Sequence, residues 1–210
     1  MDETYSSIRS HVSAQIKIEG STFIADIFPA EGEEEAKTVL ESIRKEYFDA
    51  THHCYAYVIG REKKLLRASD DGEPSGTAGI KIHSAIQSKN LSDILVVVTR
   101  YFGGTKLGVG GLGRAYFEAA IAGISSSEII TKAFAQELRI AFSFSTVNPV
   151  MNIIHSRKLK IASSTYDDNN SQVNLLVLPS TIPMLKSLFT DATRGSAEIT
   201  TGSFMTVVWQ

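Results

Sequence analysis

The sequence lacks the features of secreted, membrane-spanning and disulfide-stabilised proteins. Only one of its 210 residues is a cysteine, Cys54, so no disulfide forms within the chain and a reducing compartment is expected. Its start, MDETYSSIRSHVSAQ, has no apolar core after a positive region, so no secretory signal is predicted. The most apolar runs, such as ILVVV at 94–98, are far too short to span a bilayer. These absences predict a soluble cytoplasmic protein with no membrane partner.

Charge of one sign is also lacking. The formal net charge is −2, which gives no general reason to expect nucleic acid as a partner. Residues 1–134 carry 15 Lys and Arg against 18 Asp and Glu, a net −3, and residues 135–210 carry 6 against 5, a net +1. Any contact with a polyanion is therefore expected to be local rather than a broad electrostatic grip.

Hydrophobic periodicity predicts mixed strands and helices in the first 134 residues. Apolar residues at helical spacing indicate a helix at 33–48, and a nearly continuous apolar run at 94–102 indicates a buried strand. The remaining strands are expected at 12–19, 22–30, 54–60 and 63–69, and the remaining helices from about 77 and at about 112–124.

The rest of the chain shows a different order of strands and helices. From about residue 136 it reads strand, helix, strand, strand, helix, strand, with a turn at 168–170 between the middle strands. That order, β-α-β-β-α-β, is the ferredoxin-like pattern. The sequence therefore predicts an α+β fold of two domains, residues 1–134 and residues 135–210.

A glycine-rich segment, RYFGGTKLGVGGLGRAY, joins the strand at 94–102 to the following helix. Its glycines let a ligand approach the backbone, and the free N–H groups of a helix N-terminus suit an anion. Arg100, Lys106 and Arg114 flank the segment and bring positive charge. We favour an anion-facing surface over the alternative that the glycines only allow a strand and a helix to pack closely. The glycines are Gly103, Gly104, Gly108, Gly110 and Gly111.

Two nucleotide-binding motifs are excluded in this segment. Gly108, Gly110 and Gly113 satisfy G-x-G-x-x-G, but no acidic residue ends a buried strand about 20 residues later, as a dinucleotide fold requires. GGTKLGVG also lacks the Gly-Lys-Ser/Thr of a P-loop. No cofactor is therefore expected.

A second segment, DDGEPSGTAG, places three carboxylates close together. Asp70, Asp71 and Glu73 are near enough to bind a hard cation or to act as an acid and a base. The alternative is a structured loop, with a turn at Gly72, whose carboxylates pair with arginines or cap backbone amides. We favour this alternative because no second carboxylate cluster appears elsewhere.

The segment His52-His53-Cys54 opens a strand. His52 and Cys54 then share one face, but residues two apart on a strand lie about 6–7 Å apart, too far for a direct thiol–imidazole bond. A zinc site needs four ligands, and no further motif completes one, so no metal is expected. His53 is a candidate for a polar contact with the glycine-rich segment.

Three blocks in this order, HHCYAYVIG, DDGEPSGTAG and VVVTRYFGGTKLGVGGLGRAY, closely resemble the IMPACT/YigZ family, the "Impact N-terminal" family. The resemblance covers roughly 21–122, and 136–210 is similar to the small C-terminal domain of bacterial members. One departure is visible: family members usually have a proline two residues after GTAG, where this chain reads Ile80-Lys81-Ile82.

The resemblance implies an N-terminal β-α-β domain like those of a small-subunit ribosomal protein and elongation factor G, followed by a ferredoxin-like domain. It implies a translation- or RNA-related role, and the family offers no established enzymatic reaction to carry over. The matched motif positions are Asp71, Gly72, Glu73, Arg100, Tyr101, Gly103, Gly104 and Arg114.

We therefore expect a non-enzymatic, translation-related regulatory or binding protein that contacts RNA, the ribosome or a translation factor through residues 70–116. A docking adaptor for a protein partner stays open, as does a metal-assisted enzyme that uses Asp71 and Glu73 on a small phosphorylated or acyl substrate. The expected acidic loop is Asp70, Asp71, Gly72 and Glu73. The expected anion- or nucleic-acid-binding residues are Arg100, Tyr101, Gly103, Gly104, Lys106, Gly110, Gly111 and Arg114.

Overall fold

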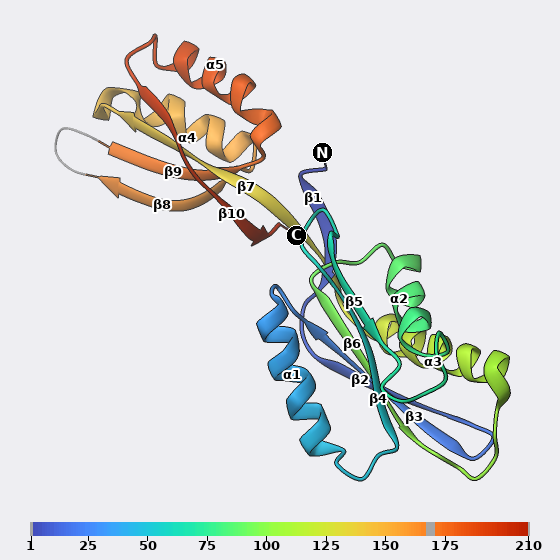
Figure 1. The fold of residues 1–210 in the computed structure, drawn as a ribbon. Helices are drawn as coiled ribbons and strands as arrows, with labels where there is room; N and C mark the ends of the chain where they lie inside the picture. Colours follow the sequence, from blue (N-terminus) through green and yellow to red (C-terminus); the bar gives the residue numbers. More distant parts are fainter. Residues whose placement is uncertain (1, 167–170, 210) are drawn as a thin grey trace. The chain divides into compact units, whose positions relative to one another are not determined.

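The computed structural model describes residues 2–166 and 171–209 (Figure 1). The chain forms two compact units. The N-terminal unit comprises residues 5–131, and the C-terminal unit comprises residues 132–209 with the residues up to Thr4. Glu3 joins the latter unit because its carboxylate accepts hydrogen bonds from the backbone N–H and the hydroxyl of Ser180, both at 2.6 Å.

The N-terminal unit is built on a five-stranded antiparallel sheet with the order β2-β3-β6-β4-β5. Helix α1 lies on one face of this sheet, and α2 and α3 lie on the other (Figure 1). The elements are β1 (Thr4–Ile8), β2 (Val12–Ile18), β3 (Ser21–Pro29), α1 (Glu33–Glu46), β4 (His52–Ile59), β5 (Leu65–Ser69), α2 (Gly79–Ser88), β6 (Ile94–Tyr101) and α3 (Gly108–Ser125).

Strand β6 is covered by helices on both faces of the sheet. Val96 and Val98 are buried under α2 and α3, whereas Leu95 and Val97 are buried under α1. A strand covered on both faces reads as a continuous apolar run rather than an alternating one. The buried strand predicted at 94–102 is therefore confirmed, with its end at Tyr101.

The C-terminal unit contains a four-stranded antiparallel arrangement with the order β10-β7-β9-β8, and β1 also pairs with β7. Two helices pack their apolar sides on β7 and β9. This element order and strand order confirm the ferredoxin-like pattern and the α+β class. The elements are β7 (Ile129–Phe142), α4 (Val147–Ser156), β8 (Lys160–Tyr166), β9 (Ser171–Val177), α5 (Ile182–Ala192) and β10 (Glu198–Val208).

The sequence patterns do not predict β1, and they misplace the start of two other elements. Strand β1, TYSSI, has only one strongly apolar residue, Ile8, so its local signal is weak. Strand β7 begins before 136, and α3 begins at Gly108 rather than at 112. Glycine costs about 1 kcal/mol in a helix interior, which the packing of α3 on the sheet outweighs. The turn expected at 168–170 lies outside the described residues.

None of the helices in the described part of the chain combines the length and the apolar character needed to cross a membrane.

The expectation of two domains makes a stability prediction. Ile140 in β7 is fully buried in the C-terminal unit, and Ile27 in β3 is fully buried in the N-terminal unit. We expect each substitution to alanine to cost about 2–5 kcal/mol. If the units unfold independently, Ile140→Ala will lower amide-exchange protection in 132–209 only, and the matched variant Ile27→Ala will lower it in 5–131 only. Equal loss of protection in both units from either variant would contradict the prediction.

Candidate functional site

Asp70 caps helix α2 from the loop that precedes it. Its Oδ1 accepts hydrogen bonds from the backbone N–H groups of Ala78 and Gly79, both at 2.9 Å, and its Oδ2 accepts one from Gly76 at 2.8 Å. Burial acts to raise the pKa of Asp70, but the three N–H donors outweigh it and hold the pKa below its ordinary value of 3.8. The carboxylate therefore satisfies N–H groups that a helix start leaves without partners.

Asp71 joins the same loop to α1 and β4. Its Oδ1 accepts a hydrogen bond from Arg44 at 2.8 Å, and its Oδ2 accepts one from the backbone N–H of His53 at 2.7 Å. Its carbonyl oxygen lies 2.8 Å from Nδ1 of His52. Gly72 follows with φ +89°, which glycine adopts without strain.

In the described part of the chain, the polar contacts of the His53 ring lie outside the glycine-rich segment. Its Nε2 lies 3.1 Å from the carbonyl oxygen of Tyr47, and its Nδ1 lies 4.0 Å from Oδ2 of Asp71. Burial lowers the pKa of His53, which favours the neutral ring. The contact expected from the sequence is thus replaced by one with the end of α1, because this side chain extends toward the α1 face of the sheet.

Glu73 and Arg100 form a buried ion pair. Nη1 of Arg100 donates to Oε1 of Glu73 at 2.6 Å, and both side chains are less than a tenth exposed. The hydroxyl of Tyr116 in α3 donates to the same oxygen at 2.8 Å. Burial raises the pKa of Tyr116 above its usual range, so its hydroxyl keeps its proton. Two donors thus hold one carboxylate oxygen inside the unit.

Cys54 extends this cluster. Its thiol lies 3.3 Å from the Tyr116 hydroxyl and 3.0 Å from the carbonyl oxygen of Asp70. Burial raises the pKa of Cys54 to about 12. A thiol that is fully buried and protonated is a structural group rather than a nucleophile.

Arg100 was expected to flank an anion site, and the structure corrects this expectation. Its guanidinium lies over the rings of Phe23 and Phe102, 5.4 Å from each centroid, and pairs with Glu73. A buried charge is stable only when it is paired, so this arginine is committed to the interior. Asp70, Asp71 and Glu73 are likewise engaged with protein groups, as the structured-loop alternative requires. Among the residues described, no cluster of three or more His, Cys, Asp or Glu side chains is placed to hold a metal ion.

The glycine-rich segment begins with a close contact between two backbones. The Gly103 N–H donates to the Ser21 hydroxyl at 3.1 Å, and a Cβ added to Gly103 would lie 1.9 Å from the carbonyl carbon of Gly20. The Tyr101 hydroxyl donates to Asp49 at 2.9 Å, so this side chain is held at the end of the sheet. Gly104 has φ +87° and faces open space.

Gly110 and Gly111 lie in the first turn of α3 rather than in a loop. Two hollows adjoin this turn and share Arg114 and Glu118. One, of about 440 Å³, is lined by Lys106 and Gly111, and the other, of about 490 Å³, is lined by Lys81 and Gly110. No acidic residue lies in the first turn of α3, so the positive end of the helix dipole is not neutralised from within the helix.

Lys81 is a residue of this surface that sequence reasoning missed. It lies on α2, and a Cβ added to Gly113 would lie 3.2 Å from its Cε, so the lysine stem crosses the start of α3. Only the packing of α2 on α3 brings it there. Within the described residues, Lys81, Lys106 and Arg114 make no ion pair, unlike Arg100 and Arg44.

Comparison with protein families identifies the class of domain that carries this fold and surface. Residues 19–124, which run from the end of β2 to α3, match the model of the Impact N-terminal domain. The chain belongs to the IMPACT family.

Two relatives and a solved structure support this assignment, and one relative and the structure match well beyond that domain. IMPACT family member YvyE of Bacillus subtilis is 33% identical over 169 residues, which cover 80% of this chain and 78% of the relative. IMPACT family member YigZ of Escherichia coli is 44% identical over 102 residues, which cover 48% of this chain and 50% of the relative. A crystal structure of a hypothetical protein matches with a TM-score of 0.65 and 28% identity, over 95% of this chain and 97% of that one.

The Asp70 cap predicts a pH dependence. Because the folded pKa lies below the unfolded one, the cap stabilises the fold above about pH 4, and this stabilisation is lost as the pH falls toward the folded pKa. We expect Asp70→Asn to lower the free energy of unfolding at neutral pH and to flatten its decline under acid, measured by urea unfolding between about pH 2 and pH 7. Asp49→Asn, which alters a carboxylate that accepts a hydrogen bond from the Tyr101 hydroxyl and caps none of the described helices, is the control. An unchanged acid profile would refute the cap.

The backbone contact at Gly103 predicts a difference between neighbouring glycines. Gly103→Ala must push the β2–β3 turn away, so we expect a loss of about 1–3 kcal/mol or more and large shifts of the amide resonances of Gly20 and Ser21. Gly104→Ala adds only the strain of a positive φ, about 1–2 kcal/mol, and is expected to leave those resonances in place. Equal perturbation of the turn by both variants would count against this contact.

Proposed function

We propose that the start of α3 binds phosphate groups of RNA, and that the protein acts in translation as a non-enzymatic regulatory or binding protein. The observation that carries this proposal is a group of three cations around the first turn of one helix, Lys81, Lys106 and Arg114, which form no ion pair with any residue that the structure describes. A cation that pairs with no carboxylate of its own chain is available to an anion of another molecule.

The backbone supports the same reading. The first N–H groups of a helix have no partner within the helix and carry the positive end of its dipole. A Cβ built at Gly108 or Gly110 would meet no atom within 4 Å, so the space beside these residues is open. A phosphate is therefore able to approach the start of α3 closely.

The number of cations predicts how strongly RNA binding depends on salt concentration. With three cations, the logarithm of the affinity for single-stranded RNA is expected to fall with the logarithm of salt concentration with a slope of about −2. This is a modest, local contact, as the small net charge of the chain suggests. An exposed ring at the same end, Phe102, is 47% exposed and offers a stacking surface to a base.

The family resemblance supports the biological setting. The blocks that carry the surface resemble those of a family whose domains are similar to parts of a ribosomal protein and of elongation factor G. Such a role places the action of the protein in the cytoplasm, with RNA, the ribosome or a translation factor as its partner.

The proposal is tested by titrating labelled single-stranded RNA with the full chain between about 50 and 200 mM salt. We expect Lys81→Gln, Lys106→Gln and Arg114→Gln each to weaken binding and to reduce the salt slope by about 0.7. Lys186→Gln, which removes the same charge from α5 in the other unit, is the matched control. Absence of binding at the lowest salt, or an equal effect of the control, would overturn the proposal.

A further inference from the structure

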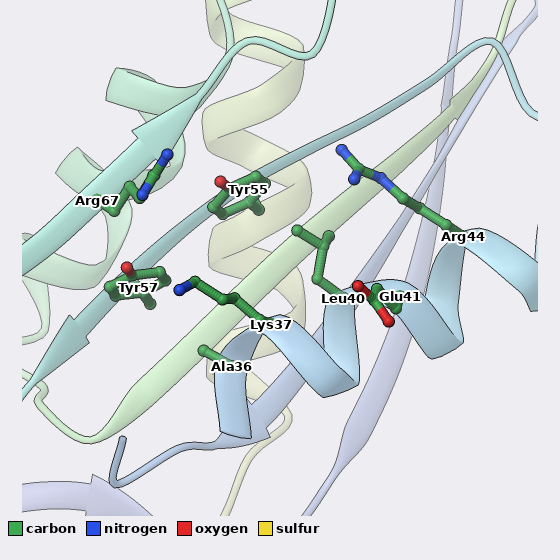
Figure 2. A pocket seen from close by; sticks show the side chains of 8 residues that line it. All are labelled: Ala36, Lys37, Leu40, Glu41, Arg44, Tyr55, Tyr57 and Arg67. Atoms are coloured by element: carbon green, nitrogen blue, oxygen red, sulfur yellow. The ribbon is translucent and has the colours of Figure 1, made fainter. Parts of the chain in front are cut away.

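A third hollow lies between α1 and the hairpin of β4 and β5 (Figure 2). Its volume is about 210 Å³. It is on the face of the sheet that carries α1, whereas the surface at α3 is on the opposite face. Its lining residues are Ala36, Lys37, Leu40, Glu41 and Arg44 of α1, Tyr55 and Tyr57 of β4, and Arg67 of β5.

One wall of this hollow is aromatic. Tyr55 and Tyr57 are two apart on β4 and share a face, and their rings stack with centroids 6.3 Å apart and planes 17° apart. Tyr57 is buried, but Tyr55 is only partly covered, and its hydroxyl has no hydrogen-bond partner among the described residues. Ala36 and Leu40 complete an apolar floor. The hollow thus offers a flat apolar surface with one open hydroxyl.

Positive charge surrounds this aromatic wall. Arg67 lies at one end and Arg44 at the other, with Lys37 between them reaching toward Tyr57 (Figure 2). Glu41 lines the hollow with them, and the three cations pair with carboxylates beside it: Lys37 with Glu33 and Glu34, Arg67 with Glu33, and Arg44 with Asp71. A ligand with a flat body and a negative group matches both the wall and its rim.

A carboxylate of the protein already occupies the anion position of this rim. Nζ of Lys37 and Nη1 of Arg67 both lie 3.5 Å from the same oxygen, Oε1 of Glu33. The hydrogen bond from Tyr57 and the charge of Lys37 lower the pKa of Glu33, so it stays ionised. Three donors from three elements therefore converge on the Glu33 carboxylate, while Nζ of Lys37 also lies 2.8 Å from Oε1 of Glu34.

The present ion pairs are exchangeable. The side chains of Lys37, Arg44 and Arg67 are 50%, 44% and 59% exposed in their pairs with acidic residues. Exposed pairs of this kind contribute little to stability, so a ligand anion replaces the carboxylate at low cost. The buried Arg100–Glu73 pair has no such freedom, because separating it would leave an uncompensated charge.

We propose that this hollow binds a single nucleotide unit, with the base against Tyr55 and the phosphate held by Lys37 and Arg67 in place of Glu33. Arg44 then faces the base from the other end of the hollow. The volume of about 210 Å³ is below the 300–1,000 Å³ of sites that enclose a whole small molecule, so the hollow covers the base while the sugar and the phosphate lie at its open rim. The ligand is either a free mononucleotide or the phosphorylated end of an RNA strand, which share this chemistry.

The test uses the full chain and amide chemical shifts. AMP, GMP, CMP, UMP, inorganic phosphate, and short RNA with a 5′-phosphate or a 5′-hydroxyl are titrated separately. We expect nucleotides to shift resonances in α1, at Tyr55 and at Arg67. Tyr55→Ala is expected to weaken binding at least fivefold through lost stacking, and Tyr55→Phe is expected to retain most of it.

A further variant distinguishes an effect on nucleotide binding from damage to the fold. Glu33→Gln removes the competing carboxylate, so we expect it to raise nucleotide affinity by up to about fivefold, a gain that a damaged fold does not produce. Arg67→Gln is expected to weaken binding. Arg114→Gln, on the opposite face, is expected to weaken RNA binding at α3 but to leave the shifts in α1, at Tyr55 and at Arg67 in place, so failure of the RNA surface and failure of this site are distinguished.

The results distinguish a free mononucleotide from an RNA strand end as the ligand, and some results would overturn the proposal. Binding of free mononucleotides assigns a free ligand, and binding only of 5′-phosphorylated RNA assigns a strand end. Inorganic phosphate that binds as tightly as every nucleotide would overturn the assignment, because the base would then contribute nothing. No shift with any of these probes, or an affinity lowered by Glu33→Gln, would also overturn it.

Discussion

The N-terminal unit depends on one buried ion pair, Arg100 with Glu73. Each partner is too deeply buried to remain charged alone, so the end of β6 and the loop before α2 must meet. Tyr116 then ties α3 to the same carboxylate, and Cys54 ties β4 to Tyr116. The three sequence blocks that stand out in the chain therefore each contribute side chains to one interior cluster.

This cluster divides the charged residues into two kinds. Asp70, Asp71, Glu73 and Arg100 face inward, toward N–H groups or one another, and hold loops in place. Lys81, Lys106 and Arg114 lie around the start of α3, are exposed, and make no ion pair within the described residues. Both kinds of charged residue occur close together in the sequence, and only their burial in the structure distinguishes the structural ones from the exposed ones.

Much of the fold could be predicted because its signals are local. The apolar run of β6 and the alternation of strands and helices after 136 each follow from periodicity. What failed depends on contacts distant in sequence. The start of α3 was hidden by glycines whose low helix propensity is outweighed by packing, and β1 by its polar composition. Arg100 was misread, and Lys81 missed, because charge alone does not reveal whether a side chain is covered or which helix it will cross.

The contact between Gly20 and Gly103 has a consequence for how the chain tolerates change. A two-residue hairpin turn at the end of a sheet is ordinarily a place where chains accept insertions, since it is exposed and makes few contacts. Here the turn at 19–20 is pressed against the backbone that leads into α3, with room for no side chain on Gly103. The length of this turn is therefore constrained. A peptide tag or a binding loop grafted at this hairpin would displace the backbone around Gly103 and so disturb the start of α3.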